Sequence, residues 1–187
     1  MPSNSRPCHI ARMIPELVTE RLTMSGPTLA DFDDSVAMWG DPDVVKHIGG
    51  KPFTREEVWS RLLRYVGHWS LMGHGFWVVR DRMTRNFVGE VGIAQFKRQL
   101  EPPLDAPEVG WVLATSAHGK GYATEAVNAA LAWGNRLGDR FSCLIDAGNV
   151  ASIRVAQKCG FQERTRTTYH GEPATIFVLD RSPAREL

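Results

Sequence analysis

The positions of apolar side chains divide the chain into segments with helical spacing and segments that alternate as strands do. Phe32, Val36 and Trp39 recur at intervals of four and three residues, which places them on one face of a helix. A second helix is predicted to begin at Thr54-Arg-Glu-Glu57. This is a capping box, in which the Thr hydroxyl and the Glu carboxylate satisfy each other's backbone N–H groups. An apolar stripe follows it as far as Gly73, where the helix should end.

The remaining elements are separated by Gly, Pro and polar turns. Their order is a strand, two helices, three strands, a helix, a strand, a helix and two strands, which predicts one α/β domain with a mixed sheet. Residues 1–16 read as a loose N-terminal lead-in and residues 17–187 as the single domain. The predicted strands are 17–24, 76–80, 86–96, 108–113, 143–146, 161–169 and 174–179, and the predicted helices are 28–39, 54–72, 121–137 and 150–158.

Composition and charge exclude some classes of partner. A chain of 187 residues can bury roughly 70% of the surface it exposes when unfolded, so it needs no disulfide bonds or structural metal to be stable. Lys and Arg number 22 and Asp and Glu 21, so the net charge of +1 supports neither nucleic-acid binding by bulk electrostatics nor a polybasic membrane anchor. No segment approaches the roughly 20 apolar residues of a membrane helix, and the first residues lack a signal-peptide core. We therefore expect a cytoplasmic protein with no nucleic-acid or membrane partner.

Most other conspicuous residues have ordinary interpretations. The three cysteines show no metal-ligand spacing and leave an odd thiol, which favours a reducing compartment; they are Cys8, Cys143 and Cys159. Four histidines also lack ligand spacing, so no metal site is predicted; they are His47, His68, His74 and His170. The residues expected in the core are Trp39, Trp59, Trp69 and Trp77, and those expected on solvated faces are Lys46, Lys51, Arg61 and Arg64.

The stretch from Glu108 to Val127 carries the clearest chemical signal. A predicted strand runs into a short Gly-rich loop, and a helix begins at Gly121. Free N–H groups at a helix start, together with the positive end of the helix dipole, favour a phosphate. The loop is not a Walker loop, because Ala114 stands where its first Gly belongs, and not a dinucleotide loop, because Thr124 stands where Gly or Ala is required. The alternative is that the glycines only make the loop flexible before a helix of the core, and that no ligand binds there.

Three blocks of sequence together resemble the GNAT family of N-acetyltransferases. His118-Gly-Lys-Gly-Tyr-Ala123 is similar to the acyl-CoA loop of that family, Gln/Arg-x-x-Gly-x-Gly/Ala, with His118 in place of Gln or Arg. Residues 149–161 are similar to Asn-x-x-Ser-x-x-Val-x-x-Lys-x-Gly-Phe, and Leu17-x-Thr-Glu-Arg-Leu22 is the third block. The trio most resembles the RimJ/RimL-type branch, which acetylates the N-termini of ribosomal proteins. The resemblance implies the GNAT α/β fold, with a mixed, mostly antiparallel central sheet flanked by helices.

The resemblance also implies acetyl-CoA as the cosubstrate. In this family the fourth strand splays from the fifth and holds the pantetheine arm, the Gly-rich loop holds the pyrophosphate, and the following helix contacts the pantetheine. The implied cofactor-binding residues are Trp111, Val112, Leu113, His118, Gly119, Lys120, Gly121, Tyr122, Ala123, Thr124, Asn149 and Ser152. Asn149 equally suits a plain helix N-cap, and the two roles are compatible.

The reaction implied is direct attack of a neutral amine on the thioester. Deprotonating an α-amino group of pKa about 8 costs roughly 1.4 kcal/mol at pH 7, so a carboxylate would suffice as the base. Glu108 starts the cofactor strand at a position where family members often carry a base, and Gly110 and Val112 on the same face should leave space beside it. The alternative is a strand-end glutamate that faces solvent, and Glu90 is the reserve base.

The proton donor to the leaving thiolate stays open. Family members often use a tyrosine seven positions after the helix Asn, and that position here is Ala156. Ser152, which joins Glu108 in the predicted catalytic set, would then orient the sulfur. Solvent, Tyr122 and Tyr169 are the other proton sources.

The acceptor is expected to be a primary amine. By resemblance, the N-terminal α-amino group of a protein leads, and a small-molecule amine (a polyamine, an amino acid or an aminoglycoside) is the alternative. An extended peptide groove would favour the first, and a closed acidic pocket the second. A module that holds acyl-CoA without turnover is a further alternative, and the resemblance admits a homodimer.

Overall fold

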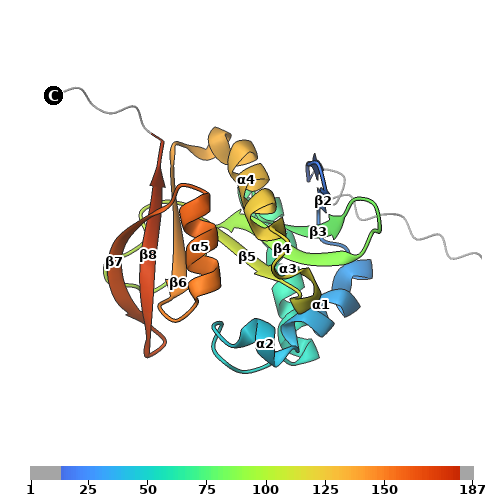
Figure 1. The fold of residues 1–187 in the computed structure, drawn as a ribbon, viewed down its shortest axis with the longest axis horizontal. Helices are drawn as coiled ribbons and strands as arrows, with labels where there is room; N and C mark the ends of the chain where they lie inside the picture. Colours follow the sequence, from blue (N-terminus) through green and yellow to red (C-terminus); the bar gives the residue numbers. More distant parts are fainter. Residues whose placement is uncertain (1–13, 182–187) are drawn as a thin grey trace, which may run out of the picture.

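The computed structural model describes residues 14–181, which form one eight-stranded sheet flanked by helices (Figure 1). Most of the predicted lead-in and Cys8 lie outside these residues. The strands are β1 (Leu17–Val18), β2 (Leu22–Ser25), β3 (Phe76–Asp81), β4 (Phe87–Ala94), β5 (Glu108–Leu113), β6 (Arg140–Asp146), β7 (Gln162–Tyr169) and β8 (Glu172–Asp180). The α-helices are α1 (Phe32–Trp39), α2 (Pro42–Val45), α3 (Arg55–Met72), α4 (Tyr122–Gly134) and α5 (Val150–Lys158).

The sheet consists of two antiparallel halves joined at one point. Its strand order is β1-β2-β3-β4-β5-β6-β8-β7, and every neighbouring pair is antiparallel except β5 and β6. Those two strands are parallel and share a single register pair, Glu108 with Ser142. Beyond this pair they diverge, as Figure 1 shows. The predicted mixed, mostly antiparallel sheet is confirmed, and so is a splayed pair beside the strand that begins at Glu108.

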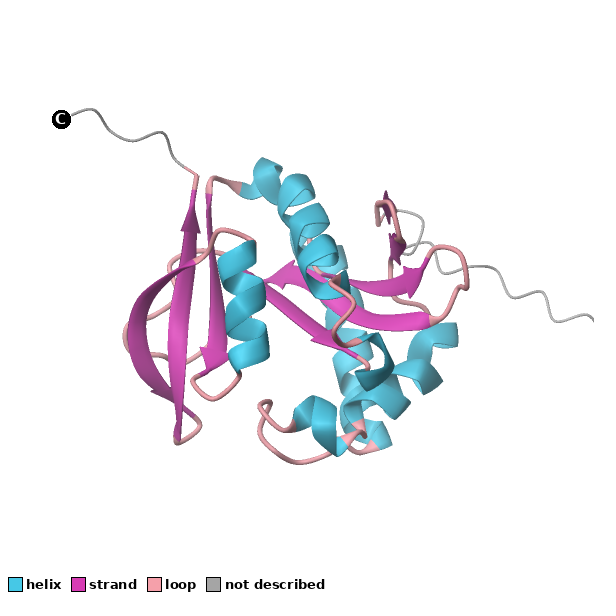
Figure 2. Cartoon of the chain, in the orientation of Figure 1, coloured by secondary structure: helices cyan, strands magenta, loops and turns pink. Residues whose placement is uncertain are grey.

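The two faces of β5 pack against different helices (Figure 2). Trp111 packs, together with Val109 and Leu113, in the core cluster that includes Val127 of α4. Val112 points the other way and packs with Met38 and Trp39 of α1. Because successive strand residues point to opposite faces, β5 separates an α4 side from an α1 side. Within residues 14–181, no helix has the length and apolar composition needed to cross a membrane.

Most predicted helices form where the sequence indicated. The Thr54 hydroxyl accepts a hydrogen bond from the Glu57 N–H at 3.2 Å, and Glu57 Oε2 accepts one from the Thr54 N–H at 2.7 Å, which confirms the capping box. These hydrogen bonds, the one from the Thr54 backbone first, lower the pKa of Glu57. The helix ends at Gly73, whose φ of 68° is left-handed, as is usual for a C-terminal cap.

The single strand predicted over residues 17–24 is wrong, because the chain turns back within it. β1 and β2 are separate and antiparallel, with Leu17 opposite Met24. The Thr19 N–H bonds to the Leu22 carbonyl at 2.9 Å, and the Thr19 hydroxyl accepts from the Leu22 N–H at 2.9 Å. A threonine that bonds its near neighbours in this way stabilises a turn in place of extended backbone. β4 also ends at Ala94, two residues before the predicted end.

Two expectations about burial are corrected. Trp39, Trp69 and Trp77 are buried as predicted, but the Trp59 residue is 40% exposed and its ring meets only the edge of Phe32 among aromatic neighbours in the described chain. Arg61, expected on a solvated face, is half-buried, with its guanidinium carbon 3.8 Å from the centre of the Trp39 ring. A planar guanidinium stacks on aromatic rings in a way that helical spacing alone does not reveal.

Candidate active site

The loop between β5 and α4 exposes its backbone. Gly119 and Gly121 have φ values of 74° and 79°, a region that residues with a Cβ rarely occupy. A Cβ added to Gly119 would meet no atom within 4 Å, so the space beside its Cα is open. The loop therefore offers N–H groups to a ligand that approaches closely.

The start of α4 lacks the caps that the other long helices carry. Its N-cap is Gly121, which offers no side-chain acceptor. By contrast, Thr54 caps α3, and the Asn149 side chain accepts from the Ser152 N–H at 3.0 Å to cap α5. The first amides of α4 therefore retain unused donors beside the positive end of the helix dipole, an arrangement that suits a phosphate.

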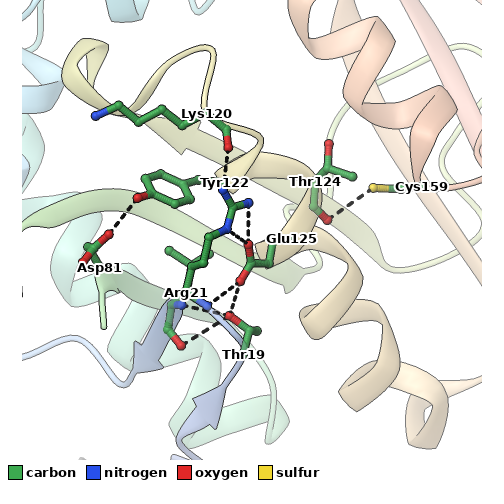
Figure 3. A network of polar contacts seen from close by, with 9 residues as sticks. Thr19, Arg21, Asp81, Lys120, Tyr122, Thr124, Glu125 and Cys159 are labelled. Carbon is green, nitrogen blue, oxygen red and sulfur yellow. Dashed lines mark hydrogen bonds and ion pairs between the residues drawn. The ribbon is translucent and has the colours of Figure 1, made fainter. Parts of the chain in front are cut away.

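A clamp from the β1–β2 turn holds this loop and helix together (Figure 3). Glu125 on α4 accepts hydrogen bonds from the Thr19 hydroxyl at 2.5 Å and the Arg21 N–H at 2.9 Å, and it pairs with the Arg21 guanidinium at 2.6 Å. Arg21 also donates to the Lys120 carbonyl at 2.8 Å. Burial raises the pKa of Glu125, but the bonds from Thr19 and Arg21 outweigh it and lower the pKa overall. Sequence reasoning missed Glu125, although a carboxylate in the first turn of a helix was a visible signal.

Tyr122 anchors the loop on a second side. Its hydroxyl donates to Asp81 Oδ2 at 2.7 Å, and Arg21 lies over its ring at 4.8 Å. Hydrogen bonds from the Thr84 N–H and then from Tyr122 lower the pKa of Asp81 to about 2, and the carboxylate raises the pKa of Tyr122. Tyr122, one of the predicted cofactor residues, thus has its hydroxyl engaged by Asp81.

The backbone of β5 beyond Glu108 is unpaired on the side of β6. The Ala114 N–H bonds to the Val88 carbonyl at 3.0 Å, and antiparallel pairs alternate in their bonding. The backbone groups of Val112 therefore face β4, whereas those of Trp111 and Leu113 face the gap toward β6. The Leu113 carbonyl contacts His118 Nε2 at 3.0 Å, which draws the His118 side chain back onto the strand.

The far side of the gap is formed by α5. Asn149 caps this helix, and the Ser152 hydroxyl is half-buried with no hydrogen bond within residues 14–181. Ala156 is fully buried, so the position at which the family resemblance led us to expect a tyrosine holds no proton donor. The Cys159 thiol lies against α4, 3.8 Å from the Thr124 carbonyl (Figure 3), and burial raises its pKa to about 11. Such a thiol is protonated at neutral pH and is a poor nucleophile.

On the opposite face of β5, Glu108 is held in a buried ion pair. Arg98 Nε and Nη2 donate to the two Glu108 carboxylate oxygens, each at 2.7 Å, and Arg98 Nη1 donates to the Tyr169 hydroxyl at 2.7 Å. Burial alone would lower the pKa of Arg98, but Glu108 and Tyr169 raise it. Sequence reasoning placed Glu108 here but missed Arg98. Tyr169, named as a proton source, belongs to this group.

Glu90, the reserve base, lies among neutral donors. Its carboxylate accepts from the Ser35 hydroxyl at 2.7 Å, the Trp39 indole N–H at 2.9 Å and the Tyr65 hydroxyl at 3.0 Å. Burial, followed by the charge of Glu90, raises the pKa of Tyr65. The Glu90 residue is only 2% exposed, so an amine substrate does not reach its carboxylate in this arrangement.

The space expected beside Glu108 is partly filled. A Cβ on Gly110 would lie 2.7 Å from the tip of the Phe76 ring, so this aromatic covers the middle of the strand. An open cavity of about 390 Å³ does adjoin Glu108, between residues 94–98 and 103–108. No group of three or more His, Cys, Asp or Glu side chains within residues 14–181 is arranged to hold a metal ion.

Comparison with known proteins identifies the chain. A family model described as an acetyltransferase (GNAT) domain matches residues 21–162. The chain belongs to the GNAT acetyltransferase family. It is similar to YkkB of Bacillus subtilis (strain 168), an uncharacterized protein, with 32% identity over 170 residues, 87% of this chain and 94% of YkkB. It is also similar to the uncharacterized N-acetyltransferase p20 of Bacillus licheniformis, with 28% identity over 79% of this chain and 82% of that protein.

A solved acetyltransferase from Agrobacterium tumefaciens strain C58 has the same fold, with 25% identity and a TM-score of 0.76 over 88% of this chain and 94% of that one. The GNAT fold is thereby confirmed. The protein is an acetyl-CoA-dependent acetyltransferase, as predicted. Its residues fit the cosubstrate, because open-faced glycines, an uncapped helix and an unpaired strand edge border one gap. The contacts assigned to individual residues stay predictions.

Proposed function

We propose that this GNAT acetyltransferase transfers the acetyl group of acetyl-CoA to a primary amine by direct attack in a ternary complex, and that a protein N-terminus is the leading acceptor. The observation that carries the proposal is the uncapped start of α4 beside the diverging strands β5 and β6. This combination supplies donors for a pyrophosphate and an open strand edge for an amide-containing arm.

The cofactor contacts follow from these donors. The amides of Gly119 to Thr124, together with the exposed Lys120, would hold the pyrophosphate, with His118 folded back on the strand. The backbone groups of Trp111 and the N–H of Leu113 would pair with the pantetheine arm, since the Leu113 carbonyl is taken by His118, and the Val112 side chain would support the strand from behind. Asn149 can contact the arm through its amide NH₂, since its carbonyl oxygen caps α5. Acetyl-CoA supplies a thioester carbonyl with a good leaving group.

The charges on the acceptor side of β5 favour a singly charged amine over a polycation. In the cavity beside β5, Glu108 is paired with Arg98 and Asp105 with Arg140 at 2.9 Å. Arg64 on α3 lies over the Phe96 ring and has no ion-pair partner within the described chain. Partial burial, with Arg61 and Arg98 nearby, lowers its pKa. A polyamine or an aminoglycoside needs several unpaired carboxylates, so these charges favour a peptide N-terminus or an amino acid.

The fold itself does not decide between acceptors. Structures that share it include a ribosomal-protein-S5-alanine acetyltransferase from Vibrio fischeri, at 19% identity, and a spermidine N-acetyltransferase from Vibrio cholerae, at 16% identity. At such identities the similarity concerns the fold alone. The preference for a peptide N-terminus or an amino acid therefore depends on the charged residues beside the cavity.

The two predicted catalytic residues differ in how many of their polar side-chain atoms are already hydrogen-bonded. The unbonded Ser152 hydroxyl is available to orient the departing sulfur. Glu108 could act as the base only through a lone pair that Arg98 leaves unused, or after Arg98 moves away from one oxygen. A homodimer stays a prediction.

Two measurements test the proposal. Acetyl-CoA should raise the melting temperature in proportion to the logarithm of its concentration above Kd. Release of free CoA, followed with a thiol reagent, should require a peptide with a free α-amino group and should be absent with the same peptide N-acetylated. Faster release with spermidine or an aminoglycoside would favour the small-molecule alternative. Binding of acetyl-CoA with no release for any amine would identify a binding module.

A further inference from the structure

One polar pair joins the two halves of the molecule near the open end of the gap between β5 and β6. His47 lies in the turn after α2, in the first half, and Asp146 is the last residue of β6, in the second half. His47 Nδ1 lies 2.9 Å from Asp146 Oδ1. Figure 1 shows the turn after α2 close to the end of β6. The contact spans 99 residues of sequence, and helical or strand spacing gives no sign of it.

The pair leaves one imidazole nitrogen available. A carboxylate can only accept a hydrogen bond, so Nδ1 carries a proton, and in the neutral ring the lone pair is on Nε2. Nε2 has no hydrogen-bond partner within residues 14–181. The side chains of His47 and Asp146 are 31% and 27% exposed, so a ligand can reach the ring. A carboxylate that fixes the tautomer and orientation of a histidine is the arrangement that prepares its other nitrogen to accept a proton.

The pair also lies close to the predicted pantetheine contacts. Asp146 Oδ1 accepts from the Gly148 N–H at 2.9 Å, and Asn149, the cap of α5, follows directly. A Cβ on Gly148 would lie 3.5 Å from the His47 ring, so the ring rests against the backbone that leads into α5. His47 forms its ion pair with Asp146. On the segment that carries His47, Asp43 and Lys46 are exposed, and the half-buried Asp41 accepts a hydrogen bond from the Thr115 hydroxyl at 3.0 Å.

The two carboxylates considered as bases are less suited to the task. Both oxygens of Glu108 are bonded to Arg98, and Glu90 accepts three hydrogen bonds at 2% exposure. By contrast, His47 is partly exposed, and its Nε2 atom has no hydrogen-bond partner within residues 14–181. We propose that His47 is the general base that deprotonates the acceptor amine, and that Asp146 is its positioning residue. This role rests on the proposed amine acetylation.

The proton and electron balance is simple. The amine nitrogen forms a bond to the thioester carbonyl carbon, and the carbon–sulfur bond breaks with its electron pair on sulfur. The proton lost by the nitrogen goes to His47 Nε2, and the resulting imidazolium or solvent returns a proton to the thiolate. The net products are an amide and free CoA, with no oxidant or reductant required.

The central test compares pH profiles of kcat/KM for a peptide amine in the wild type and in His47→Gln. General-base catalysis typically contributes about 100-fold to 10,000-fold, so His47→Gln should lose at least about 100-fold. The wild-type profile should fall at acidic pH more steeply than protonation of the amine alone requires, and the variant should keep only the part that the amine causes. The KM for acetyl-CoA and the melting temperature should change little, because His47 is half-exposed.

Further variants separate the base from a structural role. Asp146→Asn keeps an acceptor for Gly148 but removes the charge, and should reduce kcat less than His47→Gln does. Imidazole added to His47→Ala should restore activity in proportion to its neutral form. In the protein without acetyl-CoA, nitrogen NMR of the His47 ring should show a protonated Nδ1 and a bare Nε2, and Asp146→Asn should disturb this tautomer. His170→Asn, at an exposed histidine in the β7–β8 turn, is the control and should retain the full rate.

Three outcomes would overturn the role of His47. They are a His47→Gln rate above half that of the wild type from pH 6 to 9, an acidic side of the profile that is the same in that variant as in the wild type, and a neutral His47 ring whose proton lies on Nε2 in the NMR spectrum. In each of these cases the proposed acetylation itself would stand. If the wild type bound acetyl-CoA but acetylated no amine, the proposed function would fail, and the role of His47 with it.

Discussion

The two faces of β5 build their sites by different means. On the α4 face, the Gly-rich loop before α4 presents backbone amides from one continuous segment, and its glycines leave those amides unbonded. On the α1 face, the site consists of side chains from separate segments, and most of its polar atoms are already paired: Glu108 with Arg98, and Glu90 with Ser35, Trp39 and Tyr65. The first face is prepared to receive an anion, whereas the second is a satisfied network that supports the fold.

This difference has an energetic consequence. Unbonded helix-start amides stay solvated, so the α4 face loses little stability when it holds no ligand. Removing one partner from the Glu108–Arg98 pair on the α1 face leaves a largely buried charge without compensation, which is much more costly. Substitutions on the α4 face should therefore act mainly on acetyl-CoA binding, and substitutions on the α1 face mainly on stability.

The largest expected effect is on stability, from Glu108→Gln. Breaking a buried ion pair by removing one charge typically costs about 3–5 kcal/mol. For a domain of this size, each kcal/mol lowers the melting temperature by roughly 2–4 °C, so a fall of about 6–20 °C is expected. Calorimetry of the variant should show it, with acetyl-CoA affinity measured below the transition nearly unchanged.

An exposed pair gives the matched control for this prediction. Glu163→Gln removes the partner of Arg166 from an ion pair whose side chains are 51% and 84% exposed. Exposed pairs contribute about 0–1 kcal/mol, so this variant should melt close to the wild type. Equal melting temperatures for Glu108→Gln and Glu163→Gln would mean that the Arg98 pair does not support the fold.

The next effect is on binding, from Gly121→Val. A residue with a Cβ pays roughly 1–2 kcal/mol in the left-handed region that Gly121 occupies. If the loop escapes that strain by moving its amides, acetyl-CoA should bind about tenfold more weakly, as measured by titration calorimetry. The control is Gly73→Val, at the left-handed end of α3, where φ is 68° and no atom lies within 4 Å of the added Cβ. Similar weakening in both variants would show that general strain, and not the loop amides, is responsible.

The same contrast explains which features the sequence could predict. Most helices and strands and the capping box depend on neighbouring residues, so spacing and glycines were enough. The splay of the strand was expected only from the resemblance to the GNAT family, and the ligand of the Gly-rich loop stays a prediction. The turn at Thr19 was missed because its stability comes partly from Glu125, more than 100 residues away. Arg98, and the contact between His47 and Asp146, depend on which segments the folded sheet brings together. Phe76 filling the space over Gly110 is likewise a tertiary contact that period-two alternation does not contain.

A smaller effect is expected from Glu125→Gln, which weakens the clamp on the loop. The Arg21 side chain is 44% exposed, so solvent screening limits the pair to about 1 kcal/mol or less. Because the pKa of Glu125 is lowered in the folded protein, its contribution is present above the ordinary Glu value of about 4.3 and is lost as the pH falls through the lower folded-state pKa. The difference in melting temperature between wild type and variant should be constant at neutral pH and shrink below about pH 4. A difference that grows at acidic pH would contradict the clamp.

The smallest effect tests the contact between Tyr122 and Asp81 at the edge of the same loop. Tyr122→Phe removes a donor to Asp81 but leaves the Thr84 N–H, the larger cause of the low pKa. The pKa of Asp81 should therefore rise from about 2 only part of the way toward the ordinary Asp value of about 3.9. A carboxyl-carbon NMR titration of Asp81 in the two proteins measures this rise. Thr84→Ala is the comparison, because it keeps the backbone donor and removes only the hydroxyl that donates to Asp81 Oδ1 at 3.0 Å, so the pKa should rise less than in Tyr122→Phe. An unchanged Asp81 titration in Tyr122→Phe would mean that the loop is held by Arg21 and Glu125 without Tyr122, and the α4 face would then have one side-chain anchor where the structure gives it two.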